Sequence, residues 1–115
     1  MAKNKIKIRL AIPADVDAIV ALGNEVWPSF PSSREKIASR IEVFPEGNYV
    51  VEHNGEIVGY TCTQFIEYDL ESHPPFTWEE ITDGGTLKKS HHLDNPHLYG
   101  VAITVFPRYQ RSIFT

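Results

Sequence analysis

The chain has 115 residues, of which 42% are hydrophobic, 23% are charged and 11% are aromatic, and its formal net charge is -4. This length suits one domain with its own core, and the many apolar residues exclude a disordered or fibrous chain. The acidic balance argues against nucleic acid as the main partner, because binding to a phosphate backbone needs clustered positive charge.

The sequence shows no sign of a membrane or an export signal. No stretch approaches the run of about 18 apolar residues that a membrane span requires, so we expect no membrane partner. Charges at alternate positions interrupt the N-terminal stretch 1–16, unlike the apolar region of a signal peptide. The single cysteine, Cys62, cannot form an internal disulfide, so nothing indicates an oxidising compartment. We therefore expect a cytoplasmic protein.

The first two predicted elements are a strand and a helix. Residues 5–11 alternate apolar and charged side chains, which predicts a strand whose buried face consists of Ile6, Ile8 and Leu10. A helical stripe over residues 13–25 follows, with proline in its first turn, where the missing N–H costs nothing. This helix should end before Pro28, since the residue ahead of a proline avoids the α conformation.

A second helix and a hairpin follow. The spacing in residues 32–35, SSRE, is that of a capping box and predicts a helix over 33–43. Residues 49–52 and 56–65 are apolar runs on either side of Asn54-Gly55, the strongest short hairpin signal.

The segment 69–96 is predicted to be an insertion between the third and fourth strands. It contains a capping box beginning at Thr77, which predicts a short helix over 78–82. Residues 98–106 are nearly continuously apolar, which is typical of a strand covered on both faces. The predicted fold is α/β (α+β), with a mostly antiparallel sheet in the order of strands one to four.

Three segments together resemble the GNAT family of acyl-CoA-dependent N-acetyltransferases. They are 8–16 (IRLAIPADV), 48–60 (NYVVEHNGEIVGY) and 98–110 (LYGVAITVFPRYQ). The resemblance implies a single, partial GNAT-like domain over 1–115. It also implies transfer of an acetyl group from the co-substrate acetyl-CoA to a small-molecule or peptide amine, by direct attack in a ternary complex.

The chain departs from the family at residues 110–115, QRSIFT. The family continues there with glycines that let helix N–H groups hold the acyl-CoA pyrophosphate, but this stretch has none. We therefore expect a domain truncated within the pyrophosphate motif that binds acetyl-CoA weakly. The alternative function is a non-catalytic remnant that acts as a small dimeric interaction module, with the apolar strand 98–106 pairing two copies as a homodimer.

The family resemblance also indicates binding and catalytic residues. Its acyl-CoA contacts fall on the backbone of three strand residues and on the residues that follow the strand: Ile103, Thr104, Val105, Gln110, Arg111 and Ser112. As side chains, Ile103 and Val105 are expected in the core. An attacking amine needs a base, and the candidates are Glu67, Glu80 and Tyr99, with Asp69, Glu71 and Glu79 nearby.

Other conspicuous residues receive structural interpretations. His91 and His92 are adjacent and lack metal-ligand spacing, so no metal site is predicted. Cys62 is expected to be a small core residue. Trp27 and Trp78 are expected to be packing residues, although Trp27 lies in a loop that often lines the acceptor site in this family.

Overall fold

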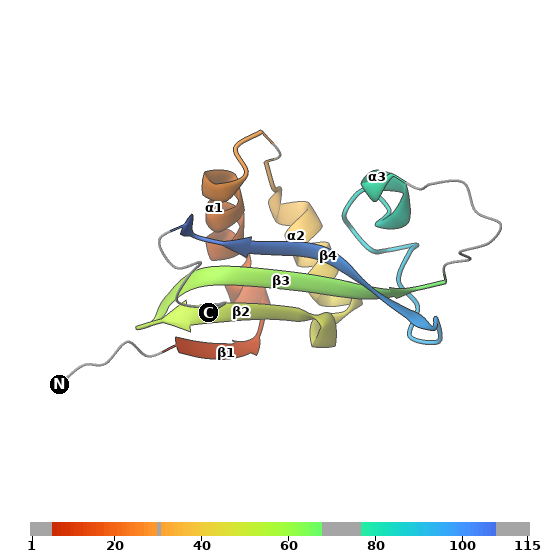
Figure 1. Cartoon of the computed structure of the whole chain (residues 1–115), viewed down its shortest axis with the longest axis horizontal. Helices are drawn as coiled ribbons and strands as arrows, with labels where there is room; N and C mark the ends of the chain where they lie inside the picture. Colours follow the sequence, from red (N-terminus) through yellow and green to blue (C-terminus); the bar gives the residue numbers. More distant parts are fainter. Residues whose placement is uncertain (1–5, 30, 68–76, 108–115) are drawn as a thin grey trace.

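The computed structural model describes residues 6–29, 31–67 and 77–107, and within them four strands form one antiparallel sheet. The strands lie in sequence order, β1-β2-β3-β4, as predicted (Figure 1). Their bounds are β1 Ile6–Leu10, β2 Asn48–His53, β3 Glu56–Ile66 and β4 His97–Val105. Two irregularities interrupt the register, one between β2 and β3 and one between β3 and β4.

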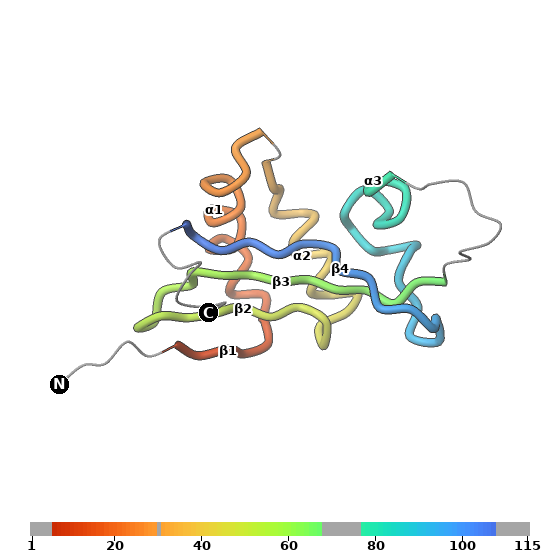
Figure 2. Tube along the Cα trace, in the orientation of Figure 1, coloured from red at the N-terminus to blue at the C-terminus, as the bar shows by residue number. Residues whose placement is uncertain are grey.

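Two helices cover one face of this sheet (Figure 1). A 3-10 turn, Pro13–Asp15, leads into α1 (Val16–Val26), and α2 (Arg34–Val43) is followed by a second 3-10 turn, Pro45–Gly47. A short helix, α3 (Trp78–Ile81), lies between β3 and β4 in the chain, and the trace in Figure 2 shows it beyond the two longer helices. Within the described ranges, no helix has the length and apolar character needed to cross a bilayer.

The local predictions for the hairpin and for α3 are confirmed. Asn54 and Gly55 both have positive φ in the turn that joins β2 to β3. The hydroxyl of Thr77 accepts the Glu80 N–H at 3.1 Å, and the Glu80 carboxylate accepts the Thr77 N–H at 3.0 Å, so the capping box is formed.

The predicted capping box of α2 is wrong by one residue. The N-cap is Ser33, whose hydroxyl accepts the Lys36 N–H at 3.2 Å. The N–H of Ser32 instead donates to the Asn24 side chain at 2.8 Å, which ties the loop to α1. Because the third helical residue is then a lysine, no carboxylate returns to the cap.

The core lies between the helices and the sheet. Val50, Tyr60 and Cys62 project from the sheet toward α1 and α2 and are buried. The helices meet them with an apolar set, Ile19, Leu22, Ile37 and Ile41. Their burial is what fixes both helices on the same face.

The face of β1 predicted to be buried is instead exposed. Directly paired residues share a face, and Arg9 pairs with the buried Val50, whereas Ile8 pairs with Val51 on the opposite side. Ile8 is consequently 65% exposed, and Ile6 and Leu10 are exposed as well. The helices cover the side of β1 that carries Arg9, because the buried residues of β2 and β3 on that side hold them there. Arg9 forms ion pairs on this side with Asp15 and Glu52.

The prediction that the fourth strand is covered on both faces is also wrong in the described residues. In those ranges β4 pairs only with β3, so it is an edge strand. Leu98 and Ile103 are 62% and 61% exposed. The apolar run therefore marks an open edge beside the helices rather than an enclosed strand.

We expect Asp15→Asn to destabilise the protein at neutral pH. Arg9 donates two hydrogen bonds to this buried carboxylate, at 2.8 and 2.9 Å, and they hold the pKa of Asp15 below its ordinary value of 3.8. A depressed pKa stabilises the fold above the unfolded pKa, and this contribution disappears as pH falls through the folded pKa. The loss should be about 1–3 kcal/mol at pH 7 and should shrink near pH 2.

Urea unfolding at both pH values measures this difference. Asp17→Asn is the matched control, because Asp17 forms its ion pair with Arg34 at the surface, where it should contribute little. Equal losses for the two variants would contradict the assignment.

Candidate functional site

A cavity of about 600 Å³ lies on the helix side of the sheet, between α1, α2, the α3 segment and β4. Its apolar wall comes from Ile19, Gly23, Ile37, Val101, Ala102 and Ile103. Two indoles and a small set of polar groups complete it, namely Trp27, Trp78, Ser32, Lys36, Arg40, Tyr60, Glu79 and Thr104. An apolar pocket with a few convergent polar groups is the usual form of a small-molecule site.

Trp27 and Trp78 stand on opposite parts of the cavity and both reach β4. The indole N–H of Trp27 donates to the Thr104 hydroxyl at 3.2 Å, and that of Trp78 donates to the Val101 carbonyl at 2.9 Å. Both indoles remain partly exposed and form walls of the cavity.

Arg40 is a buried cation in the cavity wall, with 6% of its surface exposed. Its Nε donates to the Gly85 carbonyl at 2.7 Å, and its guanidinium lies 5.8 Å from the centroid of the Trp78 ring. Gly85 has φ +86, and a Cβ there would lie 2.8 Å from the Trp78 ring and 3.2 Å from Arg40 Nη2. Only glycine permits this close approach of the α3 segment to α2.

Asn48 fixes the end of α2 that carries Arg40. This fully buried amide donates to the Arg40 carbonyl at 3.0 Å and to the Phe44 carbonyl at 2.7 Å, and it accepts the Tyr60 hydroxyl at 2.6 Å. Burial raises the pKa of Tyr60 above its ordinary value, although the charge of Arg40 opposes the rise. Tyr60 is therefore a neutral hydrogen-bond donor and not a base at physiological pH.

The backbone of β4 presents an outer edge next to the cavity. The Phe106 N–H donates to the Val58 carbonyl at 3.0 Å, and Thr104 pairs with Tyr60, so these residues direct their backbone groups toward β3. Backbone groups alternate in antiparallel strands, so the N–H and C=O of Ile103 are directed away from β3. The Val101 carbonyl, held by Trp78, lies on the same outer side.

No family model matches the sequence, but relatives with a known description exist. The chain is 36% identical over 110 residues to the probable hydrolase YhcX of Bacillus subtilis, covering 95% of this chain and 21% of that protein. It is 32% identical over 111 residues to the uncharacterized N-acetyltransferase YkwB of the same organism, covering 92% of this chain and 48% of that protein.

A solved structure agrees with the N-acetyltransferase relative. The GphF GNAT-like decarboxylase in complex with isobutyryl-CoA superposes with a TM-score of 0.73 at 28% identity, over 94% of this chain and 52% of that chain. The chain belongs to the GNAT family. It spans about half the length of YkwB and of the GphF domain and about a fifth of YhcX.

The acyl-CoA contacts inferred from the GNAT resemblance fall on different parts of the structure. Ile103 and Thr104 line the cavity, and Val105 is buried outside it. Val105 is thus a core side chain as expected, whereas the same expectation for Ile103 is wrong, because that residue is 61% exposed. Gln110, Arg111 and Ser112 lie outside the described residues.

The three candidate catalytic residues do not line the cavity. Glu67 is exposed just beyond β3, and Tyr99 is half-buried and packs against the core. The Glu80 carboxylate is bound to the N–H and hydroxyl of Thr77, and these hydrogen bonds lower its pKa, which makes it a weaker base. Among the described residues that line the cavity, Glu79 supplies the carboxylate.

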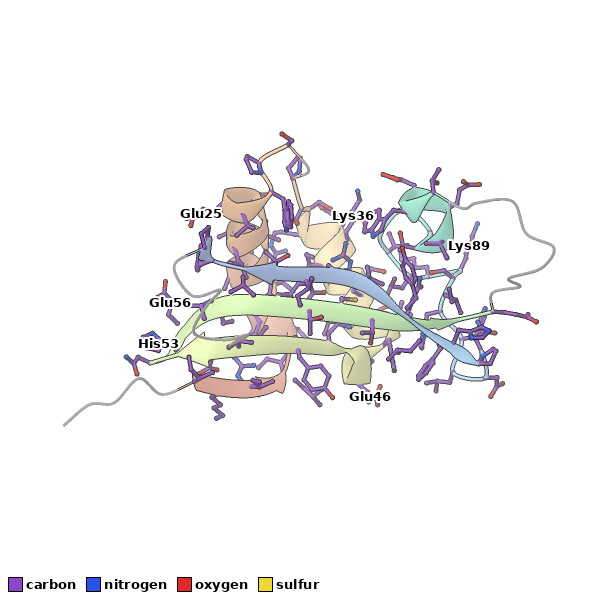
Figure 3. All side chains as sticks on the ribbon, viewed as in Figure 1. Glu25, Lys36, Glu46, His53, Glu56 and Lys89 are labelled. Carbon is purple, nitrogen blue, oxygen red and sulfur yellow. The ribbon has the colours of Figure 1, made fainter. Side chains whose placement is uncertain are left out.

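Sequence reasoning did not identify the two cations of the GNAT cavity. Lys36 and Arg40 are one helical turn apart, so they lie on the same side of α2, and Figure 3 labels Lys36 on that helix. The i, i+4 spacing was the sequence signal that places these two cations side by side on α2. It could not show that Gly85, forty-five residues later, would meet that side of the helix.

His91 has a structural role in the described part of the chain. His91 stacks on Phe44 with ring centroids 4.1 Å apart, and its Nδ1 accepts the Phe65 N–H at 3.0 Å. Burial lowers the pKa of His91, so it is neutral at pH 7. Within the described ranges, no three His, Cys, Asp or Glu side chains are grouped to hold a metal ion.

We expect Cys62 to be unreactive in the folded protein. Its thiol is fully buried in β3, and burial raises its pKa to about 11. Only about one thiol in a thousand would then be ionised at pH 8, and the thiolate is the reactive form. Ellman's reagent at pH 8 should label Cys62 after unfolding in urea but not before. Rapid labelling of the native protein would show that β3 is open to solvent.

Proposed function

We propose that this chain supplies the acceptor cavity and one edge of the donor site of an acyl-CoA-dependent N-acyltransferase, with acetyl-CoA as donor. The outer edge of β4 beside the cavity carries the proposal. Outward backbone groups at Ile103 suit a pantetheine arm that pairs like an added strand. The complex of the GphF GNAT-like decarboxylase with isobutyryl-CoA supports a CoA thioester as the ligand.

The reaction that fits this site is direct transfer. The nitrogen of a neutral amine attacks the thioester carbonyl, the new C–N bond forms as the C–S bond breaks, and the amine proton leaves while the CoA sulfur takes one up. Cys62 is buried and protonated, so it does not serve as an acyl carrier. Glu79 is the cavity carboxylate that can accept the amine proton, directly or through water.

The donor half of the proposal is tested on a polypeptide of these 115 residues. The amides of Ile103 and Thr104 should shift in ¹⁵N NMR spectra when acetyl-CoA is added. Binding should be weaker than micromolar, and we expect no measurable transfer to common amines. Loss of two charge-assisted pyrophosphate contacts would weaken binding by about a hundredfold or more.

The control ligand is adenosine 3′,5′-bisphosphate, which lacks the pantetheine arm and should not move the β4 amides. Unchanged β4 amides at millimolar acetyl-CoA would overturn the donor assignment. A micromolar dissociation constant would contradict the expected weak binding.

A second function is favoured by the apolar edge itself. Leu98 and Ile103 are exposed on a strand whose outer side carries no partner strand in the described ranges. Such an edge is a template for pairing with another chain, and a two-fold axis is the commonest arrangement. We therefore also propose a homodimer through β4, in which the module acts by association rather than by catalysis.

Light scattering at tens of micromolar, roughly the range in which weak dimers form, measures this association. We expect a dimer for the native chain and a monomer for Leu98→Lys, because a charge facing the neighbouring copy opposes pairing. Leu93→Lys is the control, since Leu93 is 71% exposed but lies outside every strand. A native chain that is monomeric under these conditions would overturn the dimer.

A further inference from the structure

Arg40 is a buried cation that lacks a carboxylate partner among the described residues. The ion pairs found there belong to Arg9 and Arg34. The Gly85 carbonyl accepts from Nε, which is one of the five N–H donors of a guanidinium, and the Tyr60 hydroxyl also lies beside the guanidinium. Burial of an unpaired charge costs free energy, so the Arg40 guanidinium is suited to bind an anionic group of a ligand in the cavity.

Lys36 strengthens the same part of the cavity. It is half-buried on the preceding turn of α2 and lines the cavity together with Arg40. Two cations one turn apart, beside an aromatic wall, create a local positive potential in the cavity. An Arg fork matches a carboxylate in two parallel hydrogen bonds, and a lysine adds a point charge.

Glu79 contributes a negatively charged carboxylate to the same cavity. The described lining therefore holds two cations and one carboxylate, and no ion pair joins Glu79 to either cation. A ligand with one carboxylate and one ammonium group complements all three charges. Trp27, Trp78 and Ile19 form an apolar part of the wall, which suits an aliphatic side chain.

We propose that the acceptor is an amino-acid-like amine, whose carboxylate is bound by Arg40 and Lys36 and whose amino group faces Glu79. The role of this ligand as an acceptor rests on the proposed acyl transfer, but its binding to the cavity requires no acyl-CoA. The same carboxylate chemistry could come from a dicarboxylic acyl group instead, so the test separates the two sources.

Tryptophan fluorescence reports directly on this cavity, because the chain has two tryptophans and both line it. The probes are L-leucine, L-leucinamide, which lacks the carboxylate, 4-methylpentanoate, which lacks the amine, and succinate, which models a dicarboxylic acyl group. Leucine should change the emission with at least tenfold higher affinity than leucinamide. 4-Methylpentanoate should lie between them.

Substitutions of the three charged side chains test which of them binds the carboxylate and which the amino group. Arg40→Met should weaken leucine binding about ten- to hundredfold, the effect of one charge-assisted contact. Lys36→Gln should weaken it several-fold and keeps the test valid if Arg40→Met does not fold, as judged by circular dichroism. Glu79→Gln should weaken leucine but strengthen 4-methylpentanoate, since the carboxylate then meets no repulsion.

Lys88→Gln and Glu42→Gln are the matched controls, because both residues are exposed and lie outside the cavity. They should change no affinity. Leucinamide binding as tightly as leucine would overturn the carboxylate site, and so would the absence of any carboxylate binding. Succinate binding without leucine binding would overturn the amino-acid acceptor. None of these outcomes depends on the acetyl-CoA experiment on β4, so the two proposals fail separately.

Discussion

The buried amide of Asn48 is the interaction on which the rest of the structure depends. Asn48, the first residue of β2, donates to the carbonyls of Arg40 and Phe44 at the C-terminal end of α2. These two carbonyls also accept the backbone N–H groups of Phe44 and Gly47. The Asn48 side chain also accepts the Tyr60 hydroxyl, so one residue joins α2, β2 and β3. Without it, the end of α2 would lose its side-chain hydrogen bonds to β2, and these bonds hold the helical turn that carries Arg40 into the cavity wall.

A second buried amide, that of Gln64, positions the α3 side of the cavity. Gln64 of β3 donates to the Ile81 carbonyl at 2.8 Å and accepts the Ser90 hydroxyl at 2.6 Å. These bonds attach the segment between β3 and β4 to the sheet, and α3 brings Trp78 and Glu79 to the cavity. The cavity is thus formed by elements distant in sequence, each fixed by a satisfied buried polar group, which is how a preorganised binding site is built.

Strand β4 borders both proposed binding sites, the acceptor cavity and the edge for acyl-CoA. Val101 and Thr104 of this strand line the cavity and accept hydrogen bonds from the two indoles. Its outer edge carries the backbone groups of Ile103, where an acyl-CoA arm or a second copy of the chain would pair. An acceptor in the cavity and a donor on the edge would therefore meet across a single strand, which is the proximity that direct transfer requires.

The sequence by itself determined the elements whose signals are local. The hairpin at Asn54-Gly55 and the Thr77 cap of α3 depend on residues only a few positions apart, and the three GNAT-like segments indicated the family without coordinates. Tertiary structure alone decided which side of β1 is covered, because alternation defines two faces of a strand but not the one that helices meet. It also decided the cavity, since Arg40 becomes a buried cation only when Gly85, forty-five residues away, approaches α2.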